Sequence, residues 1–163
     1  MRRRLPLLAS PAFLILLLGG CALTVALGRL LFTLNIDAEP NTVNISVAAP
    51  ETAVAAGDPF TVRVRIQNFL EEEQTLHSID ISNAYLQALP LQSSRPAFDR
   101  EMGIPLVNFQ SFLFSRPIRP GSTLTVELNF IAAGAGEVSG ELDVCVNAGG
   151  SCKLFPLTTV IEP

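Results

Sequence analysis

The chain has 163 residues, of which 48% are hydrophobic, and its formal net charge is -4. Its 11 Lys and Arg residues, against 15 Asp and Glu, form no basic stripe, which argues against a nucleic-acid-binding protein. The length fits one globular domain with residues to spare, and the single histidine, His77, excludes most histidine-based metal sites.

The N-terminal segment, residues 1–34, is predicted to be a membrane anchor. Three arginines at positions 2–4 precede an apolar run in which Arg29 is the only charge between Leu5 and Leu34. As a helix, Leu5 to Gly28 would span roughly 36 Å, enough for a bilayer core of about 30 Å. Because arginines stay on the cytoplasmic side, we expect an uncleaved signal-anchor helix with the rest of the chain outside the cytoplasm.

Cys21 allows other interpretations of this N-terminal segment. The sequence LGGC at residues 18–21 resembles a bacterial lipobox, in which the cysteine is acylated and becomes the mature N-terminus. However, the chain stays apolar from Ala22 to Leu34, whereas a mature lipoprotein normally continues as a polar linker. We therefore favour a retained helix, with lipidation at Cys21 and simple cleavage as the alternatives.

A polar linker at 35–42 is predicted to precede a β domain at 43–163. Apolar and polar side chains alternate in residues 60–67, 124–130 and 138–146, which is typical of strands with one buried face. Weaker strands are predicted from Val43, His77, Leu106 and Leu154. About seven short strands without a convincing amphipathic helix predict a mainly β protein, a single antiparallel β-sandwich, with residues 84–105 as a long crossover or edge region.

Two segments resemble prokaryotic immunoglobulin-like surface domains. APETAVAAGDPFTVRVRIQN at 49–68 is similar to their opening two strands, and IRPGSTLTVELNFIAAGAGEVSGELDVCV at 118–146 is similar to their closing half. The resemblance implies an immunoglobulin-like fold for the predicted sandwich. Such domains serve as spacers, adhesion modules and accessory subunits, so the fold alone assigns no function.

Cys145 and Cys152 flank Asn-Ala-Gly-Gly at 147–150, a composition typical of a hairpin turn. Paired strands would place the two cysteines opposite each other with Cα atoms about 4.5 Å apart, within the range of a disulfide. Alternation relative to Val144 and Val146 puts the bridge on the outward face. We expect a structural disulfide and not a metal-binding or redox pair, because zinc needs four ligands and no second Cys/His pair is present.

The sequence offers no catalytic constellation, so we expect no catalytic, cofactor-binding or metal-binding residues and no enzyme. It contains neither a Gly-x-Ser-x-Gly elbow nor a phosphate-binding glycine loop. Asp80 occupies the solvent position of a predicted strand between two isoleucines. Glu141 and Asp143 alternate outward, near Glu127, and could bind Ca²⁺, but carboxylates on a sheet face are usually only solubilising.

The segment NFQSFLFSRPIRPG at 108–121 contains a candidate partner contact. Phe112 and Phe114 share one strand face, which is predicted to be core. The other face is either buried as well, or forms an apolar contact surface with arginines at its rim. The candidate contact residues are Phe109, Leu113, Arg116 and Arg119.

These observations favour a single-pass protein of the cytoplasmic membrane whose domain outside the cytoplasm is an interaction or structural module. We expect it to be an accessory subunit of an envelope or membrane protein complex. Its expected partners are the membrane, through residues 5–34, and an envelope protein, without nucleic acid or cofactor. The alternative is a lipoprotein acylated at Cys21 that binds a small ligand or glycan.

Overall fold

The computed structural model describes residues 42–150 and 152–163 of the chain. The predicted anchor at 1–34, with the candidate lipidation site Cys21, lies outside these residues, as does the linker up to residue 41. Within the described ranges, no helix has the length and apolar character needed to cross a membrane.

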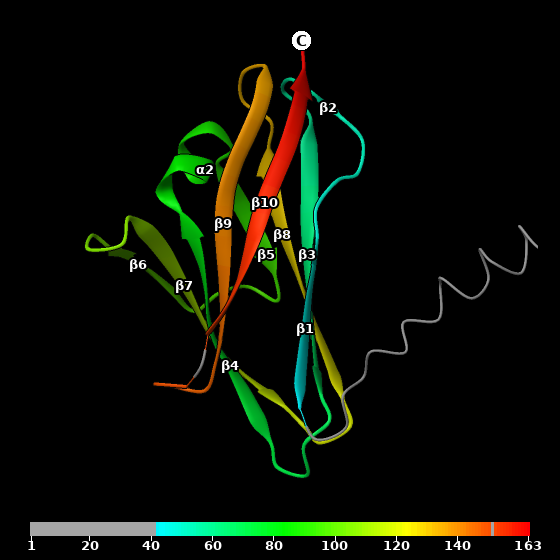
Figure 1. Cartoon of the computed structure of the whole chain (residues 1–163), viewed down its shortest axis with the longest axis vertical. Helices are drawn as coiled ribbons and strands as arrows, with labels where there is room; N and C mark the ends of the chain where they lie inside the picture. The colour runs from blue at the N-terminus through cyan, green and yellow to red at the C-terminus, as the bar shows by residue number, and fades with distance from the viewer. Residues whose placement is uncertain (1–41, 151) are drawn as a thin grey trace, which may run out of the picture. The chain divides into compact units, whose positions relative to one another are not determined.

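Ten strands of the described residues form two sheets that face each other (Figure 1). In spatial order, the four-stranded sheet contains β1 (Val43–Ala48), β3 (Pro59–Asn68), β8 (Thr123–Ile131) and β5 (Leu91–Arg95). The six-stranded sheet contains β2 (Val54–Ala55), β10 (Cys152–Glu162), β9 (Gly136–Val146), β4 (Gln74–Ser82), β7 (Phe109–Ile118) and β6 (Arg100–Ile104). All pairs are antiparallel except β2 with β10, which is parallel.

The predicted β-sandwich is confirmed, but the predicted number of strands was too low. Three strands were missed: β2 has only two residues, and β5 and β6 have five each. Residues 84–105 supply an edge strand to each sheet, and the helix α2 (Asn83–Ala88) begins just before them. The sequences LQSSR and REMGI of β5 and β6 lack regular apolar alternation because edge strands bury little of their surface.

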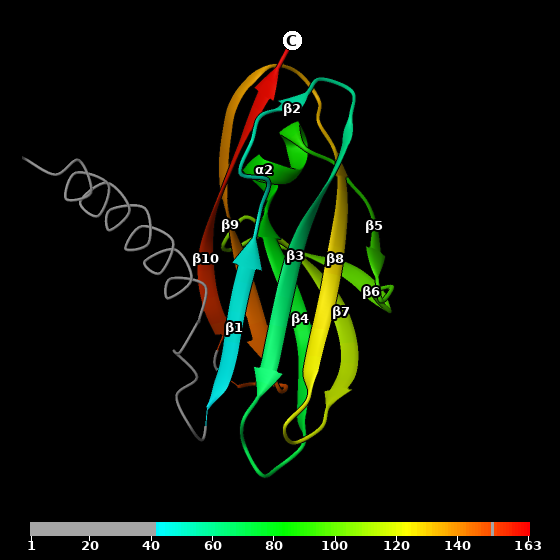
Figure 2. The same ribbon diagram turned by 90° about the vertical axis from the view of Figure 1, so that its right-hand side faces the viewer.

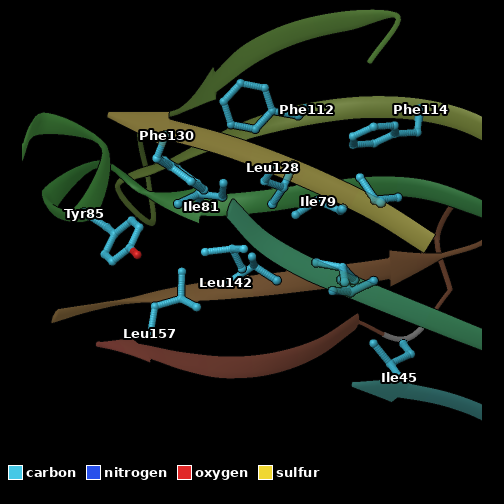
Figure 3. Packing of buried hydrophobic residues seen from close by; sticks show 14 of the residues in the cluster. Ile45, Ile79, Ile81, Tyr85, Phe112, Phe114, Leu128, Phe130, Leu142 and Leu157 are labelled. Atoms are coloured by element: carbon cyan, nitrogen blue, oxygen red, sulfur yellow. The ribbon is translucent and has the colours of Figure 1, made fainter. Parts of the chain in front are cut away.

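The core lies between the sheets and contains the alternating apolar side chains that the sequence predicted (Figure 3). In β3 and β8, every second side chain is buried or nearly so, while those between are partly or fully exposed. Ile79 and Ile81 of β4 and Leu142 of β9 belong to the same fully buried cluster as Leu128 and Phe130 of β8. Full burial of one such side chain stabilises the fold by about 1.5–3 kcal/mol.

Helix α2 follows β4 and packs at one end of the core (Figure 2). Tyr85 is fully buried, lies edge-on to Phe130 with 5.7 Å between ring centroids, and shares a hydrogen bond of 2.7 Å with Thr159 Oγ1. Gly140 of β9 lies beneath it, since a Cβ there would be 2.5 Å from Tyr85 Cβ and 2.6 Å from Ser82 Oγ. The missing side chain of Gly140 therefore provides the space that α2 occupies on β9.

This close approach predicts that Gly140→Ala lowers the free energy of unfolding by about 1–3 kcal/mol, as overpacking does. Gly103 of β6 is a matched control, because a Cβ there would meet only Gln110 Oε1, at 3.7 Å. We expect Gly103→Ala to change stability by no more than about 0.5 kcal/mol. Urea denaturation followed by circular dichroism measures both, and equal losses would contradict the packing of α2 on β9.

Burial raises the pKa of Tyr85 above its ordinary value, while the hydrogen bond with Thr159 lowers it. Because the folded chain then holds the phenol proton more tightly than the unfolded chain, this contribution to stability is complete below about pH 10 and is lost as the pH rises through the folded pKa. The chain has one tyrosine and no tryptophan, so phenolate absorbance reports Tyr85 alone. We expect ionisation at a higher pH in the folded chain than in urea, and a smaller alkaline loss of stability in Tyr85→Phe. Identical titrations in the folded and unfolded states would contradict this expectation.

Candidate functional site

The candidate functional site is a cavity of about 410 Å³ on the outer face of the six-stranded sheet, which we call the outer groove. It lies over β4, between β6 and β7 on one side and the β9–β10 turn on the other. The residues that matter for its chemistry are His77, Asp80, Arg100, Met102, Leu113, Cys145 and Cys152. The groove therefore combines apolar, acidic, basic and sulfur-containing side chains.

Strand register brings the polar groups of the groove together. On β4 and β9, the residues between the core positions point outward, and Asp80 is paired directly with Asp143. Two residues along each of these strands, Ser78 is paired with Cys145, which is in turn paired with Cys152 of β10. The two aspartates and the two cysteines thus occupy neighbouring positions on one sheet face.

The predicted disulfide between Cys145 and Cys152 is confirmed, with Cα atoms 4.1 Å apart. The bridge lies on the outward face, but its two halves differ, because Cys145 is only 7% exposed while Cys152 is exposed. Asn147 fixes the turn on β4: its side chain accepts a hydrogen bond from the Thr75 N–H at 2.9 Å and donates one to Gln74 Oε1 at 2.7 Å. These two hydrogen bonds hold the β9–β10 turn, and with it the disulfide, against β4.

Asp80 does not occupy the solvent position that the sequence predicted. Although it points outward, it is only 9% exposed, because neighbouring strands flank it on both sides. Its Oδ1 has no hydrogen-bond partner in the described part of the chain. Its Oδ2 lies 3.7 Å from Cys145 Sγ, but a disulfide sulfur carries no hydrogen to donate. Asp80 is thus a buried carboxylate without a hydrogen-bond donor from the described residues.

Asp143 shares this environment. Burial raises its pKa, the negative charge of Asp80 raises it further, a hydrogen bond from the Val144 backbone N–H lowers it, and the charge of Glu141 raises it again. Asp143 Oδ1 is also buried without a partner among the described residues. Two adjacent carboxylates with unmet hydrogen-bonding capacity make this part of the outer sheet face electrostatically unfavourable unless a positive charge compensates them. Arg100 lines the adjoining groove but, within the described residues, forms no ion pair with either carboxylate.

The calcium-binding set considered from the sequence is not assembled. Glu127 belongs to β8 in the opposite sheet, where its carboxylate pairs with Arg63 at 3.3 Å. The acidic neighbour of Asp143 across the strands is Asp80. Alternation alone places both aspartates on outward faces, but it does not show that β4 and β9 are adjacent.

The candidate contact residues of β7 have different environments. Phe112 and Phe114 are core residues, and alternation places Phe109 and Leu113 on the outer face, where both are partly buried. Leu113 lines the outer groove, and Phe109 pairs with Ile104 at the other end of β6. The structure therefore places two of the four candidates on the groove side of β7.

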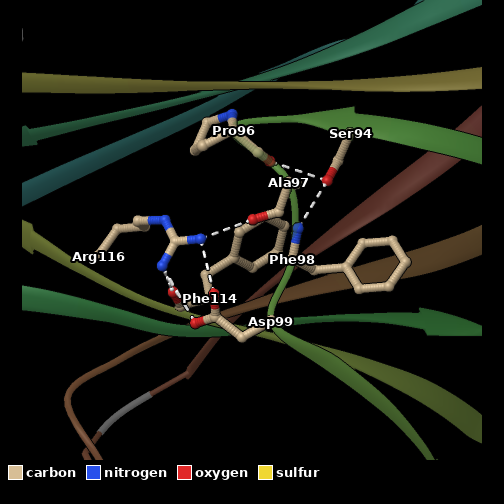
Figure 4. Close-up of polar contacts among 7 residues, drawn as sticks. All are labelled: Ser94, Pro96, Ala97, Phe98, Asp99, Phe114 and Arg116. Carbon is tan, nitrogen blue, oxygen red and sulfur yellow. Dashed lines mark hydrogen bonds and ion pairs between the residues drawn. The ribbon is translucent and has the colours of Figure 1, made fainter.

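Arg116 instead holds the crossover between β5 and β6 (Figure 4). Its guanidinium forms two hydrogen bonds with the Asp99 carboxylate, at 2.7 and 3.1 Å, and donates to the carbonyl oxygens of Ala97 and Phe114 at 2.8 and 2.6 Å. This clamp keeps Phe98 against Phe112, with ring centroids 5.1 Å apart. Arg119, in contrast, is exposed at the turn that follows β7.

Comparisons with known proteins give structural neighbours only. No protein-family model matches the chain, and no curated protein matches it. One similar structure is the C-terminal domain of the antigen I/II polypeptide BspA of Streptococcus agalactiae, with 11% identity and a TM-score of 0.47, covering 74% of this chain and 50% of that one. Another is the C-terminal domain of AspA, an antigen I/II-family protein of Streptococcus pyogenes, with 14% identity and a TM-score of 0.45, covering 73% and 46%.

A third similar structure is a cohesin module of a family 33 glycoside hydrolase from Clostridium perfringens, with 14% identity and a TM-score of 0.43, covering 75% of this chain and 98% of that one. The chain spans about half the length of the two streptococcal structures.

The unpaired carboxylate predicts that Asp80→Asn raises the free energy of unfolding at neutral pH, by about 1–3 kcal/mol. The substitution removes a buried charge beside Asp143 and introduces an amide that can donate toward it. Glu101→Gln on β6 is the control: Glu101 is exposed, so we expect a change within about 0.5 kcal/mol. Urea denaturation measures both, and a loss of stability in Asp80→Asn would show that the carboxylate is compensated in the folded chain.

Proposed function

We propose that the chain is a membrane-anchored interaction or structural module outside the cytoplasm, and an accessory subunit of an envelope or membrane protein complex. The apolar segment at 5–34 supports the anchor because it is longer than a secretory signal core of about 7–15 residues. The Cys145–Cys152 disulfide supports a place outside the cytoplasm, since such bonds persist in oxidising compartments.

The observation that carries the interaction role is an exposed apolar surface on the hairpin formed by β6 and β7. Five large hydrophobic side chains are exposed among the described residues, and three of them belong to this hairpin. They are Met102, Leu106 and Val107, with 48%, 99% and 60% exposure, and we call them the hairpin surface. Transfer of apolar side chains out of water lowers the free energy. Their concentration at one place therefore favours contact with another molecule.

A strand of another protein fits this surface best. β6 is the terminal strand of its sheet, so its outer edge has no neighbouring strand among the described residues. An added strand would hydrogen-bond to that edge, while its apolar side chains cover Met102. Arg100 and Glu101 lie at the start of the same strand and would give the contact a charged rim.

The test is site-specific photo-cross-linking in intact membranes with the full-length chain. We expect a cross-linking residue in place of Leu106 to yield a discrete adduct with a second protein, and Met102→Asp to weaken it. Val160 is the matched control position, since it is an exposed hydrophobic residue on β10, away from the hairpin. Absence of an adduct, equal adducts from both positions, or an adduct made only of two copies of this chain would contradict the accessory-subunit role.

One observation favours the alternative of a lipoprotein that binds a small ligand or glycan. Because Cys145 and Cys152 are bonded to each other, Cys21 is the one remaining cysteine and it follows the lipobox-like LGG. Mass spectrometry of the purified N-terminus separates the two cases. A chain beginning at an acylated Cys21 would replace the signal-anchor proposal, whereas a retained arginine-rich N-terminus would exclude lipidation.

A further inference from the structure

Four potential metal ligands occupy neighbouring positions on the outer face of β4, β9 and β10: Asp80, Asp143, Cys145 and Cys152. A carboxylate oxygen of Asp143 and the Sγ atoms of both cysteines all lie within 4.8 Å of one another. Asp80 Oδ2 lies 3.7 Å from Cys145 Sγ. We propose that the chain with reduced cysteines binds one zinc ion through this set, named here the thiol–carboxylate cluster, and that the disulfide closes the site.

The buried carboxylate of Asp80 indicates that the cluster suits a cation. Asp80 is 9% exposed, lines the outer groove, and has no hydrogen-bond donor from the described residues. Such a group is expensive to bury unless a positive charge or donors compensate it. Asp143, paired with Asp80 across the strands, adds a second negative charge at the same place. A metal ion bound between them would supply the missing compensation.

The donor set favours zinc over calcium. Zinc is commonly bound by four ligands in a tetrahedral arrangement and accepts both thiolate sulfur and carboxylate oxygen. Calcium prefers about six to eight oxygen ligands, whereas two of the three mutually close ligand atoms here are sulfur.

The disulfide makes the site conditional on redox state, because a sulfur bonded to another sulfur is not a thiolate ligand. Cys152 is exposed, so a reductant can reach its Sγ, while Cys145 is covered. A protein dithiol that donates two electrons and two protons would break the S–S bond, leave two thiols and itself become a disulfide. Zinc then replaces the two thiol protons, which pass to solvent.

The test uses the full-length chain with Cys21→Ser in non-ionic detergent, so that only the two cysteines of the cluster remain. A trialkylphosphine reduces the bond: it becomes the phosphine oxide with oxygen from water, and the two hydrogens of that water go to the sulfurs. We expect the reduced chain to bind one equivalent of Co²⁺ with the visible absorption of a tetrahedral thiolate site, which Zn²⁺ abolishes. We expect the oxidised chain to show neither change.

Substitutions test whether the metal binds at this cluster or only to acidic side chains in general. Removing even a residue that only orients a metal ligand typically lowers metal affinity about tenfold or more. We therefore expect Asp143→Asn and Asp80→Asn each to lower the affinity by at least about tenfold. Glu127→Gln makes the same charge change on the opposite sheet, outside the groove, and should leave metal affinity unchanged.

Circular dichroism recorded alongside the titration makes each result decisive. A reduced chain that is folded but binds no metal overturns the proposal, and so does equal binding by the oxidised chain or binding unaffected by both aspartate substitutions. If reduction unfolds the chain, recovery of the fold on adding Zn²⁺ supports the site, because a ligand of the folded state stabilises that state. Failure to recover overturns it. The cross-linking test concerns the hairpin surface, so either proposal can fail alone.

Discussion

The position of β4 within the six-stranded sheet is the constraint on which the rest of the structure depends. It is hydrogen-bonded to β9 on one edge and to β7 on the other, and it is buried on both faces over most of its length. Its inner side chains, Ile79 and Ile81, lie in the core. At its C-terminal end, Ser82 Oγ accepts a hydrogen bond from the Glu141 N–H at 3.1 Å. A polar residue placed in this strand is therefore removed from water by its neighbours.

The two faces of this sheet have different chemistry as a result. The inner face is apolar and forms part of the core, while the outer face buries Asp80 and one carboxylate oxygen of Asp143, which packing alone does not require. Sequences that fold reliably usually satisfy their buried polar groups, and exceptions concentrate where a protein binds or reacts. The outer groove is such an exception, beside a disulfide that has one buried and one exposed half.

Local patterns were sufficient to predict part of this structure. Alternation identifies β3, β8 and β9 because each buries one face, and the cysteine pair is recognisable because both residues belong to one hairpin. The burial of Asp80 depends on which strands flank β4, and this information is not local. Likewise, Arg116 looks like a rim residue in the sequence, since its partner Asp99 lies in an irregular crossover. The space above Gly140 becomes visible only when α2 is placed on β9.

The direction of the strands places the two ends of the domain far apart. β1 begins at one end of the sandwich, whereas β10 runs to the opposite end, where Ile161 pairs with Val54 of β2 (Figure 1). The 11 residues of β10 correspond to a length of about 36 Å at roughly 3.3 Å per residue. A chain that enters at Val43 therefore leaves the domain one full strand length away. The two ends of the β domain therefore lie at opposite ends of the sandwich, separated by the length of one long strand.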